Sequence, residues 1–121
     1  MSYNEEGSLI SDISSIFVFG GPMPTEAAYQ AQLIKKIERR FPDCFVMKND
    51  PDHIQGIPDL LILFECYWAA LEVKKSASEP FQPNQEYYLN LMNNMSFAAC
   101  IFPENEEEVL DELQSAFFSV R

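Results

Sequence analysis

The chain has 121 residues, 47% of them hydrophobic, and a formal net charge of -11 at pH 7. This length and composition fit one domain with an apolar core and exclude a disordered tail. No apolar run approaches the roughly 20 residues of a membrane span, and the N-terminus lacks the basic start of a signal peptide. The three cysteines have no CxxC spacing, so we expect free thiols in an intracellular, reducing compartment.

Residues 1–24 are expected to form an arm, and residues 25–121 to form one domain. Within the arm, residues 13–19 could pair as a strand or pack on the core. Thr25 is a good N-cap for a helix that Pro42 brings to an end. Apolar residues recur along this helix with the spacing of a buried stripe. They are Ala27, Tyr29, Leu33, Ile34, Ile37 and Phe41.

Four apolar runs after this helix have the length and the boundaries of strands. They lie at residues 44–47, 60–64, 68–73 and 97–102, the last of which we expect to be central in the sheet. A helix is predicted at about 84–94, packing through Tyr88, Leu91, Met92 and Met95. Pro103 is expected to start a final helix, whose acidic first turn (Glu104, Glu106, Glu107 and Glu108) suits the positive end of the helix dipole. The order α-β-β-β-α-β-α predicts an α/β fold, a mixed sheet with helices on both faces.

The runs at 60–64 and 68–73 are expected to form a hairpin that turns at Glu65 and Cys66. This register places Asp59 opposite Glu72, where two like charges are destabilising unless a cation joins them. Lys74 falls on the same face as Glu72, because side chains alternate along a strand. The turn lacks the Gly or Asn of a tight hairpin, so a longer loop could shift the register. In another interpretation, Asp59 only begins a strand and Glu72 pairs with a neighbouring lysine.

These residues carry a resemblance to a known superfamily. The pattern Pro58-Asp59, hairpin, Glu72-Val73-Lys74 resembles the PD-(D/E)xK nucleases, which have a restriction-endonuclease-like core. With Gly56 before it and Gln85 after it, the pattern is similar to the VRR-NUC and phage Holliday-junction-resolvase-like branches. The resemblance covers roughly residues 25–113, which is most of the chain.

The resemblance implies a role for each matching residue. Asp59 and Glu72 would bind Mg²⁺, for which Mn²⁺ could substitute, and the backbone carbonyl of Val73 would be a further ligand. Lys74 would orient the attacking water or stabilise the charge of the transition state. Glu26 would support the metal or its waters, although it could instead only compensate the helix dipole. Gln85 would bond water or phosphate, although it could also be an ordinary polar residue of a first helical turn.

Nucleic-acid binding must be reconciled with the acidic composition. Most of the excess acid lies near the two ends, whereas residues 26–100 hold ten acidic and seven basic residues. Contact with phosphates depends on a local basic patch rather than on the total charge. Such a strip is expected from Lys35, Lys36, Arg39, Arg40, Lys48 and Lys75. In the alternative, the bases of the first helix pair with Glu38 or with the acidic C-terminal helix.

Three functions remain open at this point. The first is a magnesium-dependent endonuclease acting on branched DNA such as a four-way junction, which would imply a homodimer because two symmetric nicks are needed. The second is a nuclease of the same fold that acts on other DNA or on RNA. The third is a non-catalytic protein that binds a partner through its acidic surface. Each would act inside a cell, in the cytoplasm or a host cell, or at the nucleoid if the protein is bacterial or from a phage.

Overall fold

The computed structural model describes residues 2–5, 7–10 and 25–118. Within the first 24 residues, β1 (Ser2–Glu5) and β2 (Gly7–Ile10) form an antiparallel hairpin that the expected arm did not include. The strand or packing segment considered for residues 13–19 lies outside the described residues. No helix in the described ranges is both long and apolar enough to cross a membrane.

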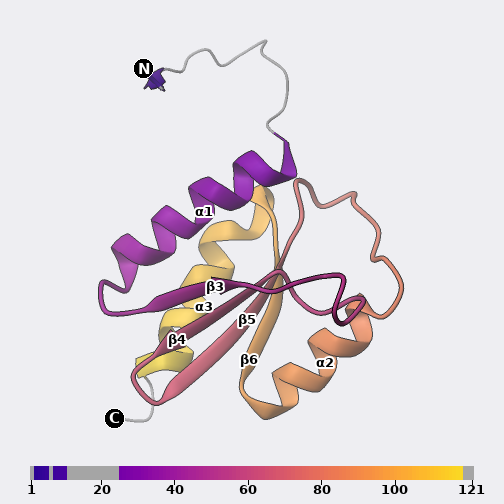
Figure 1. The fold of residues 1–121 in the computed structure, drawn as a ribbon. Coiled ribbons are helices and arrows are strands. Elements are labelled where there is room, and N and C mark those ends of the chain that lie inside the picture. Colours follow the sequence, from indigo (N-terminus) through magenta and orange to yellow (C-terminus); the bar gives the residue numbers. More distant parts are fainter. Residues whose placement is uncertain (1, 6, 11–24, 119–121) are drawn as a thin grey trace.

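The main body is a four-stranded sheet with three α-helices (Figure 1). In chain order its elements are α1 (Glu26–Arg40), β3 (Phe45–Lys48), β4 (Leu60–Phe64), β5 (Tyr67–Val73), α2 (Gln85–Met95), β6 (Phe97–Ile101), a 3-10 turn (Pro103–Asn105) and α3 (Glu106–Phe118). The predicted α-β-β-β-α-β-α order and mixed sheet are confirmed, since β5 and β6 are parallel and the other pairs antiparallel.

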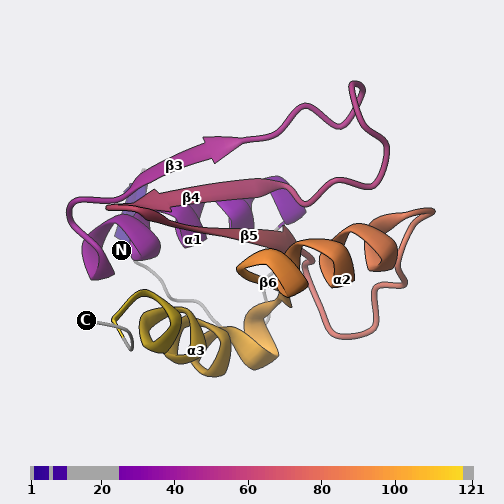
Figure 2. The same ribbon diagram turned by 90° about the horizontal axis from the view of Figure 1, so that it is seen from below.

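The strand order β3-β4-β5-β6 corrects one expectation about the sheet. The strand at 97–102 was expected to be central, but β6 forms an edge. Its apolar sequence has another cause, because α2 packs against β6 on one face of the sheet and α3 on the other. Figure 2 shows α2 and α3 on the side of the sheet where β6 lies and α1 behind the other strands. A strand covered on both faces needs apolar residues even at an edge.

Helix α1 begins and packs largely as its sequence indicates. The Thr25 hydroxyl accepts a hydrogen bond of 3.0 Å from the backbone N–H of Ala28, which is an N-cap interaction. Ala27 is exposed, whereas the rest of the predicted stripe is fully or half buried. The buried members are Tyr29, Leu33, Ile37 and Phe41. These four residues pack with apolar residues of the sheet and of α3 in the main core.

The three helices divide between the two faces of the sheet. The main core includes Leu60, Ile62 and Leu71 of the sheet and packs against α1 and α3. The other face carries α2, which packs through Leu89 and Met92 in a small cluster with Ala70, Ala98 and Trp68. The predicted packing face of α2 is therefore wrong in part: Leu91 and Met95 are exposed, because α2 presents Leu89 to the small residues beneath it.

The β4–β5 hairpin has the register predicted from the sequence. Leu61 pairs with Ala70 and Leu63 with Trp68, so the same register carries Asp59 to the position opposite Glu72. The two-residue turn closes without Gly or Asn because Glu65 itself takes a positive φ of 56°. Few non-glycine residues adopt this conformation, which is why the sequence left the loop length open.

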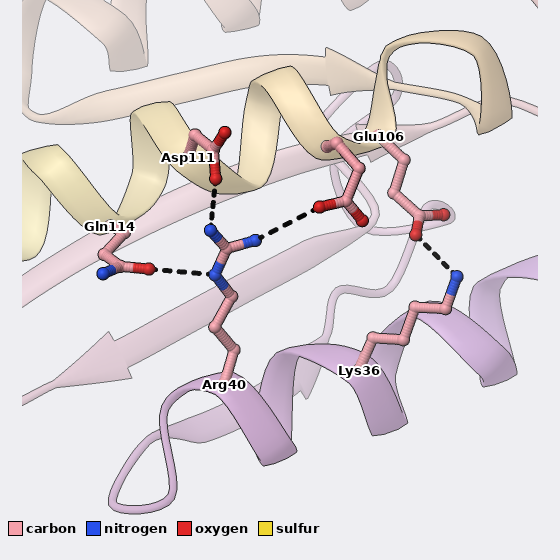
Figure 3. A network of polar contacts seen from close by, with 6 residues as sticks. Lys36, Arg40, Glu106, Asp111 and Gln114 are labelled. Atoms are coloured by element: carbon pink, nitrogen blue, oxygen red, sulfur yellow. Dashed lines mark hydrogen bonds and ion pairs between the residues drawn. The ribbon is translucent and has the colours of Figure 1, made fainter.

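A polar network joins α1 to α3 across the surface (Figure 3). Glu106 accepts hydrogen bonds from the Tyr29 hydroxyl at 2.9 Å and from the Lys36 ammonium at 2.6 Å. Arg40 bonds Gln114 at 2.9 Å and pairs with Asp111. Glu106 was expected to interact with the positive end of the helix dipole, but it is only 7% exposed and its carboxylate connects α3 to α1. The final α-helix also starts at Glu106 rather than at Pro103.

Replacing Glu106 by Ala should lower the free energy of unfolding by about 1–3 kcal/mol, because the buried Tyr29 hydroxyl loses its acceptor. Glu107→Ala is the matched control, since Glu107 is exposed and its carboxylate lies 3.8 Å from Arg40. It should change the unfolding free energy by about 0.5 kcal/mol or less. Urea unfolding of both variants measures the difference, and equal effects would contradict a structural role for Glu106.

Candidate active site

Asp59 and Glu72 meet at the end of the β4–β5 hairpin. Asp59 directly precedes β4, and its Oδ2 accepts a hydrogen bond of 2.8 Å from the backbone N–H of Val73. Glu72 is the penultimate residue of β5, pairs with Cys100 on β6 and is 2% exposed. The hairpin therefore holds two carboxylates at adjacent positions on neighbouring strands, as its register predicted.

Lys74 and Gln85 complete a buried polar group with Glu72. Lys74 is 4% exposed, and its ammonium lies 3.8 Å from Glu72 Oε2. The Gln85 side chain bridges the two: its Oε1 accepts from Lys74 Nζ at 2.9 Å, and its Nε2 donates to Glu72 Oε2 at 2.9 Å. The backbone N–H of Gln82 also donates to Gln85 Oε1, at 2.7 Å. Gln85 thus sets the relative positions of the carboxylate and the ammonium.

Burial makes Glu72 a weak acid. Its pKa rises to about 8, chiefly because burial disfavours the charged carboxylate and secondly because Asp59 is nearby. Lys74 acts in the opposite direction but does not compensate. Glu26, in the first turn of α1, is close enough to belong to the same group, and burial and then Asp59 raise its pKa as well. Three acidic side chains from α1, β5 and the start of β4 thus share one electrostatic site.

The donor set fits a hard divalent cation. Glu72 Oε1 is buried and accepts no hydrogen bond from any described residue, so one carboxylate oxygen lacks a partner. Side chains within the described residues do not gather three His, Cys, Asp or Glu groups in a metal-binding cluster. Mg²⁺ does not require such a cluster, since it typically keeps several waters and takes one or two protein carboxylates. Asp59 and Glu72 meet that requirement.

Gly56 joins the loop before β4 to the start of α2, a contact to which the sequence pattern assigned no role. Its φ is +90°, and a Cβ at this position would lie 2.7 Å from the Asn84 Cβ and 2.7 Å from the Pro83 carbonyl oxygen. Asn84 has a positive φ of 72° and directly precedes Gln85. Only a residue without a side chain allows the two loops to approach this closely. The loop that leads to Asp59 therefore supports the turn that presents Gln85.

The six basic residues of the expected strip fall into two groups. Lys48, at the end of β3, pairs with Leu60, which directly follows Asp59, but strand alternation places it on the same side as Val46. Lys75 directly follows Lys74, and its ammonium pairs with Glu79 at 3.9 Å. The basic residues of α1 follow Glu26 by 9 to 14 positions, which places them about 13–21 Å away along the helix axis. These residues are Lys35, Lys36, Arg39 and Arg40.

Two of the α1 bases already have partners on α3. Lys36 and Arg40 pair with Glu106 and Asp111, as the alternative interpretation of the sequence proposed (Figure 3). Lys35 and Arg39 are exposed. Binding of phosphates by these six residues stays a prediction, and Lys48 and Lys75 are the members nearest to the carboxylates.

Comparison with solved structures identifies the fold. One structure, described as a VRR_NUC domain protein, matches with a TM-score of 0.60 and 17% identity over 79% of this chain and 90% of that chain. A second, described as a VRR_NUC domain, matches with a TM-score of 0.54 and 18% identity over 73% of this chain and 97% of that chain. The chain has the VRR-NUC fold. No protein-family model and no curated protein matches the sequence.

In this VRR-NUC fold, Gly56→Ala should destabilise the protein by about 1–2 kcal/mol. The alanine backbone would have to keep a positive φ, and its Cβ would clash with Asn84. Gln55→Ala, at the exposed neighbouring position, should change stability by about 0.5 kcal/mol or less. Adding Asn84→Gly to Gly56→Ala removes one of the clashing atoms and should restore part of the loss. A double-mutant cycle of unfolding free energies measures this coupling, and strict additivity would contradict the contact.

The raised pKa of Glu72 predicts that stability falls with pH when divalent ions are absent. The folded state retains a proton on Glu72 up to about pH 8, whereas the unfolded state loses it near 4.5. Stability therefore decreases as the pH rises through this window. Glu72→Gln should remove that decrease and raise the Tm at pH 8. Each unit of pKa shift corresponds to about 1.4 kcal/mol, enough to move the Tm by roughly 5 °C.

The prediction is checked by measuring the Tm of the wild type and of Glu72→Gln in EDTA at pH 5 and at pH 8. Glu86→Gln, an exposed glutamate on α2, is the control and should keep the pH dependence of the wild type. Equal pH dependence in Glu72→Gln and the wild type would show that Glu72 is ionised in the folded state.

Proposed function

We propose that this chain is a magnesium-dependent endonuclease that hydrolyses phosphodiester bonds in branched or otherwise structured DNA. The proposal depends on four residues at one end of the β4–β5 hairpin. Gln85 is hydrogen-bonded to both Lys74 and Glu72, and Asp59 is hydrogen-bonded to the backbone of Val73, next to Glu72. The VRR-NUC fold of the chain and the resemblance of its sequence motif both support a nuclease.

Asp59 and Glu72 would hold the metal, together with the backbone carbonyl of Val73. Glu26 would hold one of the metal's waters from α1, and Mn²⁺ would replace Mg²⁺ without other changes. When bound, the cation supplies a nucleophile by lowering the pKa of its water and stabilises charge on the phosphate. Binding it would also offset the burial of Glu72 and the repulsion from Asp59, which together raise the pKa of this carboxyl.

Lys74 would provide the positive charge that the transition state needs. Its ammonium has no acceptor capacity, so it can only donate to a phosphate oxygen or to the attacking water. Gln85 holds this ammonium with its carbonyl oxygen, which keeps Lys74 pointed at the carboxylates without requiring a direct, fully formed ion pair. The buried position of Lys74 strengthens each of these interactions.

Replacing either Asp59 by Asn or Glu72 by Gln should abolish metal-dependent nicking while the protein stays folded. Lys74→Ala should lower kcat by about 10²–10³ and leave metal binding in place, because it removes a cation rather than a ligand. Glu86→Gln is the control and should cut at the wild-type rate. Metal-dependent cleavage that persists in purified Asp59→Asn would refute the assignment.

The substrate is tested with a four-way junction and a linear duplex of the same sequence, with and without magnesium. Faster cutting of the junction, together with a dimer in sedimentation, would support a junction-resolving enzyme. Equal cutting of both would place the protein among nucleases with another DNA target, and cutting of RNA alone would exclude a DNA target. No cutting of any of them would favour a binding protein that retains the fold.

A further inference from the structure

Asn49 holds the backbone on both sides of Asp59. Its backbone N–H donates to the Asp59 carbonyl oxygen at 2.8 Å, and its side-chain Nδ2 donates to the Pro58 carbonyl oxygen, also at 2.8 Å. The first bond orients the peptide that follows the Asp59 Cα, and the second orients the peptide that precedes it. Because a residue has only two soft backbone dihedrals, fixing both flanking peptides fixes the direction in which the Asp59 side chain leaves the backbone.

The sequence around Asp59 explains why a side chain makes the second bond. The β3–β4 register pairs Lys48 with Leu60, so the next pair is Asn49 with Asp59. Beyond this pair the ladder cannot continue in the usual way, because Pro58 has no backbone N–H. Pro58 is buried, and a buried carbonyl oxygen without a donor costs free energy. The amide of Asn49 supplies that donor.

The loop between Asn49 and Asp59 gives Asp59 no other support of this kind. Among the described residues, the remaining hydrogen bonds of the loop close short turns inside residues 50–57. Gly56, near the end of the loop, contacts the start of α2 instead. Asn49 is therefore the residue through which β3 sets the backbone of Asp59.

The carboxylate of Asp59 is held from the opposite direction. Its Oδ2 accepts a hydrogen bond of 2.8 Å from the backbone N–H of Val73 on β5. The carboxylate can reach this N–H only while the Cα–Cβ bond of Asp59 points towards β5. Asp59 is thus held by β3 through its backbone and by β5 through its carboxylate, and Glu72 lies buried beside it.

We infer that Asn49 is a positioning residue of the site, which orients Asp59 so that its carboxylate and Glu72 can share one divalent cation. The part of the inference that concerns the cation rests on the proposed function, whereas the orientation of Asp59 does not. Asn49 acts through Asp59 and touches neither the cation nor the substrate. Groups that orient a metal ligand typically contribute about 10–100-fold to metal affinity.

The amide proton of Val73 reports the orientation of Asp59 in the absence of metal. A hydrogen bond to a carboxylate is strong and moves the NMR resonance of the donor proton downfield. Asn49→Ala removes the donor to Pro58, so the Val73 resonance should shift upfield in EDTA. Asn49→Ser, whose hydroxyl is one bond too short for this contact, should cause the same shift. The test therefore does not depend on one variant.

Asn93→Ala is the matched control. The side chain of Asn93 also bonds the sheet backbone, since its Oδ1 accepts a hydrogen bond of 3.0 Å from the N–H of Ala98. Ala98 lies near the start of β6, opposite Ala70 and away from the carboxylates. Asn93→Ala should lower the Tm and leave the Val73 resonance in place.

Mn²⁺ titration by calorimetry measures the consequence for the metal, at a temperature well below the Tm of each variant. Asn49→Ala should weaken Mn²⁺ binding by about tenfold, whereas Asn93→Ala should bind as the wild type does. A role for Asn49 in stability alone would lower the Tm and leave the Mn²⁺ affinity of the folded protein unchanged.

Two results would overturn the inference. An unchanged Val73 resonance in both Asn49 variants would show that Asp59 keeps its orientation without the amide. A shifted resonance with unchanged Mn²⁺ affinity would show that this orientation does not serve the metal. If the resonance shifts as expected but the wild type binds no Mn²⁺, the positioning of Asp59 by Asn49 stands and the proposed function fails.

Discussion

The burial of Glu72 opposite Asp59 is the constraint on which the rest of the site depends. Two carboxylates at facing strand positions repel each other, and burial removes the water that would screen them. The protein offsets part of this cost with Lys74 and Gln85, yet one oxygen of Glu72 finds no hydrogen-bond partner among the described residues and its pKa stays raised. The folded structure therefore favours the binding of a cation beside these two carboxylates.

The surrounding structure serves to hold that group in place. The hairpin fixes Asp59 against the backbone of Val73, and α1 brings Glu26 to the same end of the sheet. The loop contact at Gly56 sets the turn before α2, and α2 in turn presents Gln85. Elements far apart in the chain thus converge on a site at one end of the sheet. The acidic α3 lies on the opposite face, where its charges pair with α1.

That pairing changes how an acidic chain could act on DNA. Glu106 and Asp111 of α3 pair with Lys36 and Arg40, so these bases stabilise the contact between two helices and offer less positive charge to a phosphate backbone. Lys75 follows Lys74 in sequence, but its ammonium pairs with Glu79 at 3.9 Å.

The sequence by itself determined the order of the elements and predicted the hairpin register that places Asp59 opposite Glu72, because strand alternation is a local property. Only the structure decided the length of the turn, through the positive φ of Glu65. The sequence did not determine that β6 is an edge strand, that Leu89 rather than Leu91 faces the sheet, or that Glu106 is buried. Nor did it show the contact of Gly56 with Asn84. These features depend on which surfaces meet after folding. A helix or strand sequence records how apolar each position is, but only the packed tertiary structure decides which neighbour covers it.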